Sequence, residues 1–209
     1  MSELETLLKK GDVKQAQSVA DSRLKSDPND VEALLVRARV HMAFREVEQA
    51  AELITKANEL GEPEARLWGA ILGDQMGHPD AGRLLEDVCR TATRYEPFFV
   101  LGRLLNTQKR FAEARPHLER AVQLDPSQAL PHFQLAYALM EIGDVKLGAD
   151  HLEQTLRLNP LYTPTYLVLT QLLVGNGRPD QAVELLKKGL GLMPGNEKLK
   201  AELAKLLPS

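Results

Sequence analysis

Apolar positions recur with the period of a helix in residues 130–142. Apolar side chains stand at Phe133, Ala136, Leu139 and Met140, close to the 3.6-residue period of a helix with one apolar side. This stretch therefore predicts an amphipathic helix that buries one face.

A second helical pattern follows at residues 145–158. A Gly-Asp pair at 143–144 separates the two stretches, and glycine can adopt the positive φ that ends one helix while aspartate can cap the next. The second stretch ends at an Asn-Pro pair at 159–160, because proline cannot continue a helix interior and disfavours helix in the residue before it. Residues 127–160 therefore predict one helix–turn–helix unit.

This unit recurs along the chain with a period of about 34 residues. A small residue stands in the middle of each first helix, and another follows 12 residues later in the second helix of every complete repeat. The first-helix positions are Ala38, Ala70, Gly102, Ala136, Thr170 and Ala204, and the second-helix positions are Ala16, Ala50, Gly82, Ala114, Gly148 and Ala182. Such a period predicts an array in which each unit packs on its neighbours.

These positions resemble the tetratricopeptide repeat (TPR), whose pattern has a small residue in the first helix, alanine and a second small residue in the second helix, and a terminal proline. The resemblance implies an all-α fold, a right-handed superhelical solenoid of helix–turn–helix units. It also implies a single array over residues 1–209, with a partial N-terminal repeat at 1–28, five repeats over 29–194 and a C-terminal capping helix at 195–209.

Two features depart from the regular pattern. The glycine between the helices of a repeat is replaced by Arg45 and by Lys109 in two repeats. The step from one repeat to the next shortens from 15 to 13 residues on both sides of residues 63–94, the repeat that contains Trp68. We expect a change of superhelical pitch around residues 60–100; the alternative is that fraying helices absorb the deletions.

Composition argues against nucleic-acid binding, an internal disulfide and membrane insertion. Lys plus Arg number 26 against 29 Asp plus Glu, which leaves no concentrated basic footprint for a nucleic-acid backbone. The single Cys89 excludes an internal disulfide and is expected to be a buried small residue. Residues 1–10 are polar and no later apolar run reaches ~18 residues, so we expect a cytoplasmic protein without membrane insertion.

Motifs that carry chemistry are missing from the sequence. It contains no phosphate-binding glycine loop, no His-x-x-x-His and no Cys-x-x-Cys. His117 and His151 occupy equivalent places one repeat apart, too distant to share a metal ion, and are expected to pack between helices. We therefore expect no enzyme, no catalytic or metal-binding residue and no cofactor.

The resemblance implies that first helices line a concave groove that binds a protein or peptide segment. An apolar row and a mixed row of arginine, aromatic and amide side chains fall on that face. The expected groove residues are Leu35, Arg39, Leu67, Trp68, Phe99, Arg103, Asn106, Phe133, Tyr137, Met140, Leu167 and Gln171. The alternative is that the apolar row (Leu35, Leu67, Phe99, Phe133 and Leu167) packs against the adjacent first helix.

The function expected from this pattern is that of a non-enzymatic scaffold or adaptor that holds a partner segment in the groove. One alternative is a chaperone for a secretion or assembly substrate. Another is an RNA-binding helical repeat, which Glu32, Glu64 and Glu96 at the first groove positions disfavour. No first helix contains the Lys-x-x-x-Asn with which co-chaperones of the family grip a C-terminal carboxylate.

Overall fold

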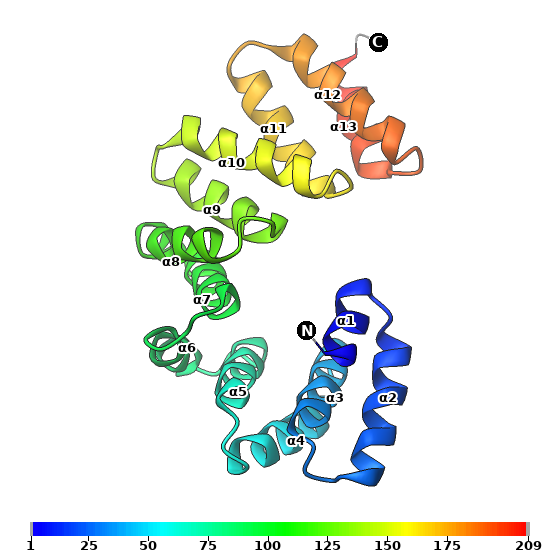
Figure 1. The fold of residues 1–209 in the computed structure, drawn as a ribbon. Coiled ribbons are helices and arrows are strands. Elements are labelled where there is room, and N and C mark those ends of the chain that lie inside the picture. Colours follow the sequence, from blue (N-terminus) through cyan, green and yellow to red (C-terminus); the bar gives the residue numbers. More distant parts are fainter. Residues whose placement is uncertain (1, 208–209) are drawn as a thin grey trace. The chain divides into compact units, whose positions relative to one another are not determined.

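The computed structural model describes residues 2–207, and this part of the chain is all-helical, with thirteen α-helices and no strand (Figure 1). The helices are α1 (Glu3–Lys10), α2 (Val13–Ser26), α3 (Val31–Ala43), α4 (Val47–Glu59), α5 (Pro63–Gln75), α6 (Ala81–Cys89), α7 (Tyr95–Thr107), α8 (Phe111–Leu124), α9 (Ala129–Glu141), α10 (Val145–Leu158), α11 (Thr163–Gly175), α12 (Pro179–Leu192) and α13 (Glu197–Leu206). Odd-numbered helices up to α11 are the first helices of repeats, and even-numbered helices are the second helices. The expected all-α repeat fold is confirmed.

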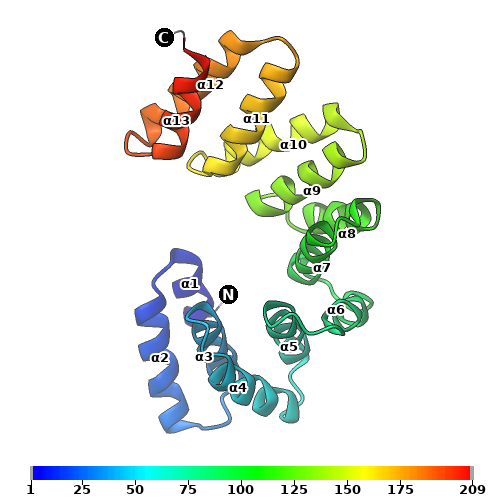
Figure 2. The same cartoon turned by 180° about the vertical axis from the view of Figure 1, so that it is seen from behind.

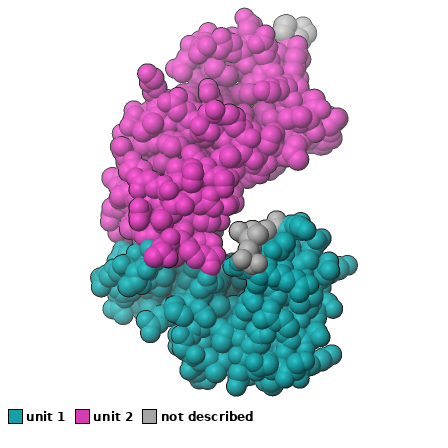
Figure 3. Space-filling view, in the orientation of Figure 1, with its two compact units in different colours: residues 1–92 teal, residues 93–209 magenta. Residues whose placement is uncertain are grey.

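Two compact units make up the chain, residues 1–92 and residues 93–209 (Figure 3). In the first unit, α1 to α6 form three successive helix pairs (Figures 1 and 2). In the second unit, α7 to α12 form three more pairs, and α13 packs on α11 and α12. The boundary lies in the link between α6 and α7, where the second short inter-repeat step occurs.

A residue with left-handed backbone conformation stands between the helices of every repeat. These residues are Gly11, Arg45, Gly77, Lys109, Gly143 and Gly177. Arg45 has φ of 60° and Lys109 has φ of 59°, values that L side chains rarely adopt. The two departures from the family pattern therefore change the side chain and keep the turn, at a cost in backbone strain.

The turn after α9 fits the sequence only in part. Gly143 has the expected positive φ, at 92°. Asp144 precedes α10, but its side chain makes no capping hydrogen bond. Its carboxylate lies 3.7 Å from Nη1 of Arg115 instead. Asp144 is therefore the N-cap residue of α10, as expected, but its side chain does not supply the capping hydrogen bond.

Small residues allow close helix contacts where the sequence placed them. A Cβ atom at Gly102 would lie 2.4 Å from Cγ of Leu118, and one at Gly148 would lie 2.6 Å from Cγ of Met140. Both distances are shorter than any tolerated contact between carbon atoms. Larger side chains at these positions would push the two helices of a repeat apart.

Helix α6 is shorter than the other second helices, with nine residues against 13 or 14. Ala81 is 2% exposed and Leu85 is fully buried, whereas Gly82 is half-buried. Ala81 therefore takes the buried position expected for Gly82, because the helix begins only after Pro79 and Asp80. Helix α6 also ends early, at Cys89, just before the second short step, and both the change of pitch and its alternative stay predictions.

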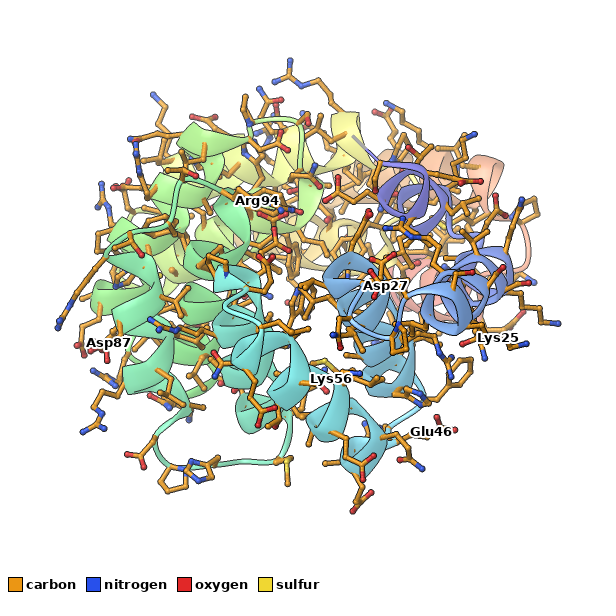
Figure 4. All side chains as sticks on the ribbon, turned by 60° about the horizontal axis from the view of Figure 1, so that its bottom comes forward. Lys25, Asp27, Glu46, Lys56, Asp87 and Arg94 are labelled. Carbon is orange, nitrogen blue, oxygen red and sulfur yellow. The ribbon has the colours of Figure 1, made fainter. Side chains whose placement is uncertain are left out.

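Polar contacts join successive repeats within the first unit. Lys56 of α4 extends toward the turn between α2 and α3, and its ammonium donates to the carbonyl oxygen of Pro28 over 2.6 Å (Figure 4). Arg37 of α3 lies 2.7 Å from Asp21 of α2. These bonds fix the first two repeats against each other.

Candidate partner-binding surfaces

A hollow of about 250 Å³ opens on the first unit, where residues of α1, α3 and α5 converge. We call it the first-unit hollow. Its lining consists of Ser2, Glu5, Val31, Glu32, Leu35, Val36, Arg39, Glu62, Glu64 and Trp68. Most of these residues belong to first helices, so the hollow lies on the face that sequence analysis assigned to the partner.

Helical spacing brings the lining residues to one face. Val31, Leu35 and Arg39 follow each other at intervals of four residues along α3, and Glu64 and Trp68 do the same along α5. The guanidinium carbon of Arg39 lies 4.5 Å from the centroid of the Trp68 ring, a cation–π contact between the two helices. The indole Nε1 of Trp68 is buried and has no hydrogen-bond partner in the described structure.

Carboxylates at the starts of α3 and α5 are held in place by local contacts. Arg23 donates to Oε2 of Glu32 over 2.9 Å, and the hydroxyl of Ser2 donates to the other oxygen of Glu32. Glu62 is the N-cap of α5 and accepts a hydrogen bond from the backbone N–H of Glu64 over 3.2 Å. The negative side of the hollow is therefore ordered by the chain itself.

The expected groove residues of the first unit differ in their exposure. Arg39 and Trp68 are half-buried and line the hollow. Leu35 lines the hollow but is only 6% exposed, while Leu67 is 8% exposed and is not part of the lining. The two leucines mainly pack the array, which agrees with the alternative that the apolar row supports the neighbouring helix.

Three expected groove residues of the second unit are packing residues. Phe133 and Met140 pack on the core cluster around Leu152 and Leu169. The Phe133 ring also meets the Tyr162 ring edge-on, with centroids 5.0 Å apart. Leu167 packs in the same way against the cluster around Tyr166, Leu186 and Leu199.

Asn106 is 5% exposed and acts within the fold. Its Nδ2 donates to both the backbone oxygen and Oε1 of Gln134, each over 3.0 Å, which joins α7 to α9. A buried side chain that is committed to this bond is poorly placed to contact a partner.

The remaining expected residues of the second unit reach the surface. Tyr137 is 41% exposed and meets the Phe111 ring edge-on, with centroids 5.6 Å apart. Gln171 is exposed, and Phe99 and Arg103 are half-buried. Phe133, Met140 and Leu167 are also only half-buried, so of the expected groove residues of the second unit only Asn106 is buried.

The second unit contains a pair of histidines whose contact was not predicted from the sequence. Nδ1 of His132 and Nδ1 of His151 lie 2.9 Å apart, and Nε2 of His132 lies 3.2 Å from the carbonyl oxygen of Pro126. Burial lowers the pKa of both rings, and for His151 the neighbouring His132 lowers it further. His151 packs between helices as expected; the contact was missed because its partner lies on the facing helix.

A sequence signal for the pair exists one repeat further on. Tyr166 stands 34 residues after His132, and its hydroxyl donates to the carbonyl oxygen of Pro160 over 2.9 Å. His132 makes the equivalent bond to Pro126. A ring with a polar tip at this position therefore indicates a bond to the proline carbonyl of the preceding turn.

The described residues give no support to metal binding, a reactive thiol or a membrane span. Among residues 2–207, no group of three or more His, Cys, Asp or Glu side chains is placed to hold a metal ion. Burial, and secondarily the charge of Glu86, raises the pKa of the Cys89 thiol to about 12, so this thiol stays protonated. No helix within the described part of the chain is long and apolar enough to span a membrane.

Comparison with known families assigns the chain. One model of the tetratricopeptide repeat matches residues 3–65 and 79–129, and a second matches residues 105–172. The chain therefore belongs to the TPR family. Its fold is a scaffold typical of protein–protein interaction, and proteins of this family are generally non-catalytic.

Two characterised relatives share part of the chain. The small glutamine-rich tetratricopeptide repeat-containing protein 2 of Mycosarcoma maydis is 32% identical over 85 residues, which cover 41% of this chain and 24% of the relative. The Hsp70–Hsp90 organizing protein of Triticum aestivum is 34% identical over 95 residues, which cover 46% of this chain and 16% of the relative. The matched regions thus span about a quarter or less of these proteins.

Solved structures show the same fold at low sequence identity. A chain of the APC/C hetero-tetramer Cut9–Hcn1 matches with a TM-score of 0.82 and 18% identity, over 97% of this chain and 41% of that one. The type IV pilus biogenesis factor PilW matches with a TM-score of 0.73 and 20% identity, over 98% and 95% of the two chains. YrrB, described as a TPR protein with an unusual peptide-binding site, has a TM-score of 0.64 and 19% identity over 89% and 97%.

Proposed function

We propose that this chain is a non-enzymatic scaffold that binds a segment of a partner protein against its first-helix faces. The observation that carries the proposal is the first-unit hollow, which residues of α1, α3 and α5 line without filling. Three successive repeats contribute to it, so a segment lying there contacts the array rather than a single repeat.

The composition of the hollow supports a protein partner. Tryptophan and arginine are enriched at protein interfaces, and Trp68 and Arg39 meet at this surface. The volume of about 250 Å³ is below the roughly 300–1,000 Å³ of pockets that enclose small-molecule ligands. A hollow of this size suits one or two side chains of an extended segment whose backbone runs across the helices.

A co-chaperone adaptor is the second candidate function. The likeness to the Hsp70–Hsp90 organizing protein of Triticum aestivum favours it. Capture of a C-terminal carboxylate in the first-unit hollow is disfavoured, because Glu5, Glu32, Glu62 and Glu64 would repel that group. In such an adaptor this hollow would hold an internal segment of the partner.

Site-specific photo-cross-linking tests the proposal. Benzoylphenylalanine at Glu5, which lines the hollow, should capture a partner from extracts of the source cells. The matched control carries the same group at Glu52, which is exposed on the second helix α4. Mass spectrometry of the adducts should find partner peptides at Glu5 and few at Glu52. Adducts at Glu52 alone would place the binding surface on the second helices.

A further inference from the structure

We propose that the first-unit hollow selects a basic partner segment, in which an arginine or lysine stands beside an apolar residue. The inference rests on the proposed function and adds the chemistry of the segment. Three features of the hollow support it: the sign of its charges, an aromatic ring that accepts cations, and an aliphatic wall.

Charge is the first feature. Among the described lining residues, Glu5, Glu32, Glu62 and Glu64 carry carboxylates and Arg39 is the one cation. Arg23 lies outside the lining and pairs with Glu32. When its positive charge is counted as well, the four carboxylates still leave a net negative charge around the hollow. Carboxylates grouped around a partly enclosed space attract cationic ligands and repel acidic ones, which sets specificity as well as encounter rate.

The Trp68 ring is the second feature. The guanidinium carbon of Arg39 lies 4.5 Å from its centroid, so this ring already accepts a planar cation, and both residues line the hollow. That guanidinium belongs to the same chain, so in the free protein Arg39 occupies the place on the ring that a cationic side chain of the partner would take. Aromatic faces and carboxylates together bind arginine and lysine side chains better than either does alone.

The aliphatic wall is the third feature. Val31 of α3 is half-buried and lines the hollow, together with the small exposed parts of Leu35 and Val36, which are 6% and 2% exposed. Arginine and lysine carry hydrocarbon stems that pack on apolar surface while the charged ends reach polar partners. An apolar neighbour in the segment would add to this contact, which is why we specify a mixed basic and apolar sequence.

A second hollow on the same unit lacks this combination. It has a volume of about 790 Å³, lies between α4, α5 and α6, and carries Glu62, Arg66 and Asp87 among its lining residues. Two carboxylates against one arginine make it less negative than the first-unit hollow, and its lining contains no aromatic ring. Basic selectivity is therefore expected at the first-unit hollow only.

Intrinsic fluorescence provides the test, because Trp68 is the single tryptophan of the chain. The full chain is titrated with short synthetic peptides of alternating leucine and arginine, blocked at both ends. Matched peptides carry glutamine or glutamate in place of arginine. We expect a saturable change of Trp68 emission with the arginine peptide, roughly tenfold weaker binding of the glutamine peptide and no saturable change with the glutamate peptide.

Charge variants separate a specific site from general attraction. Glu62→Gln with Glu64→Gln should weaken binding of the arginine peptide roughly tenfold. Glu48→Gln with Glu52→Gln removes the same charge from exposed positions on α4 and should leave binding nearly unchanged. Arg39→Gln removes the internal cation from the ring and should tighten binding. Thermal unfolding of each variant verifies the fold.

Three results would overturn the inference: equal losses in the two double variants, equal or tighter binding of the glutamate peptide, or weaker binding by the Arg39→Gln variant. The proposed function fails separately. If the cross-linker at Glu5 captures a segment without basic residues, the scaffold function stands and the basic selectivity is wrong. If basic peptides bind the hollow while cross-links arise only at Glu52, the assignment of the partner face is wrong.

Discussion

The imidazole rings of His132 and His151 meet with their Nδ1 atoms 2.9 Å apart and so join α9 to α10. Nε2–H of His132 donates to the carbonyl oxygen of Pro126, since a carbonyl can only accept. Nδ1 of His132 is then the acceptor, and Nδ1–H of His151 is the donor. This hydrogen bond needs a proton on one Nδ1 and none on the other. Protonation of both rings therefore abolishes it.

Stability should therefore fall as the pH falls below about 6.5. Burial lowers the pKa of both rings in the folded chain, so the unfolded chain takes up protons first. Asp150 and Glu119 oppose the shift of His151 but do not reverse it. The stability contribution is complete above the unfolded pKa and is lost as the pH falls toward the folded values. Urea denaturation across this range measures the change.

His132→Tyr is the control for that pH dependence. A tyrosine there can donate to Pro126 as Tyr166 donates to Pro160, so the turn keeps its hydrogen bond. One titrating ring and the ring–ring bond disappear. The loss of stability below about pH 6.5 should shrink clearly in this variant. An unchanged pH dependence would assign the effect to other groups.

Gly148→Ala should destabilise the second unit by about 1–3 kcal/mol. The new Cβ would lie 2.6 Å from Cγ of Met140 and 3.0 Å from the backbone oxygen of Ala136. Gly191→Ala is the matched control, because Gly191 lies within α12 with nothing within 4 Å of a Cβ there. That change should raise stability by up to ~1 kcal/mol through helix propensity. Equal denaturation midpoints of the two variants would contradict the tight contact.

Arg45→Gly and Lys109→Gly should each raise stability slightly, by up to about 1 kcal/mol. Both residues hold a left-handed backbone that glycine adopts without strain. The gain is reduced by the larger conformational freedom of glycine in the unfolded chain. Gly143→Ala provides the comparison at the equivalent turn and should lower stability by about 1 kcal/mol. A lower melting temperature of both glycine variants would show that the side chains stabilise the turns.

Phe133→Ala and Tyr137→Ala should behave differently, although both positions belong to the expected groove. Phe133 packs on the core cluster around Leu152 and against Tyr162, so its truncation should cost about 2 kcal/mol. Tyr137 is 41% exposed, and its truncation should cost less than about 1 kcal/mol. Chemical denaturation of the two variants measures this difference. Similar losses would mean that Tyr137 is also part of the core.

The sequence predicted the repeat fold well because periodicity and small residues are local signals. The bounds of α10 at Val145–Leu158 match the amphipathic stretch at residues 145–158. In α6 the buried small residue is Ala81 and not Gly82, because a turn that contains a proline delays the start of the helix. The constant 12-residue step in the sequence does not reveal this shift of one residue. A pattern of apolar positions also does not tell which of them the neighbouring repeat covers, and Leu67 is an example.

The candidate site was less predictable because it depends on contacts between helices. Arg39 and Trp68 were both expected in the groove, but their direct contact follows from the register of α3 against α5. The ordering of Glu32 by Arg23 likewise depends on the position of α2. Neither relationship has a fixed spacing in the sequence that would indicate it beforehand.

Nuclear magnetic resonance of the labelled chain with the cross-linked partner segment, prepared as a peptide, tests the central claim most directly. The single Trp68 provides one indole N–H signal from the first-unit hollow. The account predicts that this signal and the amides of Val31 and Glu64 shift most upon saturation with the peptide. Shifts confined to the second helices α2 and α4, with the Trp68 signal unchanged, would contradict binding on the first-helix face.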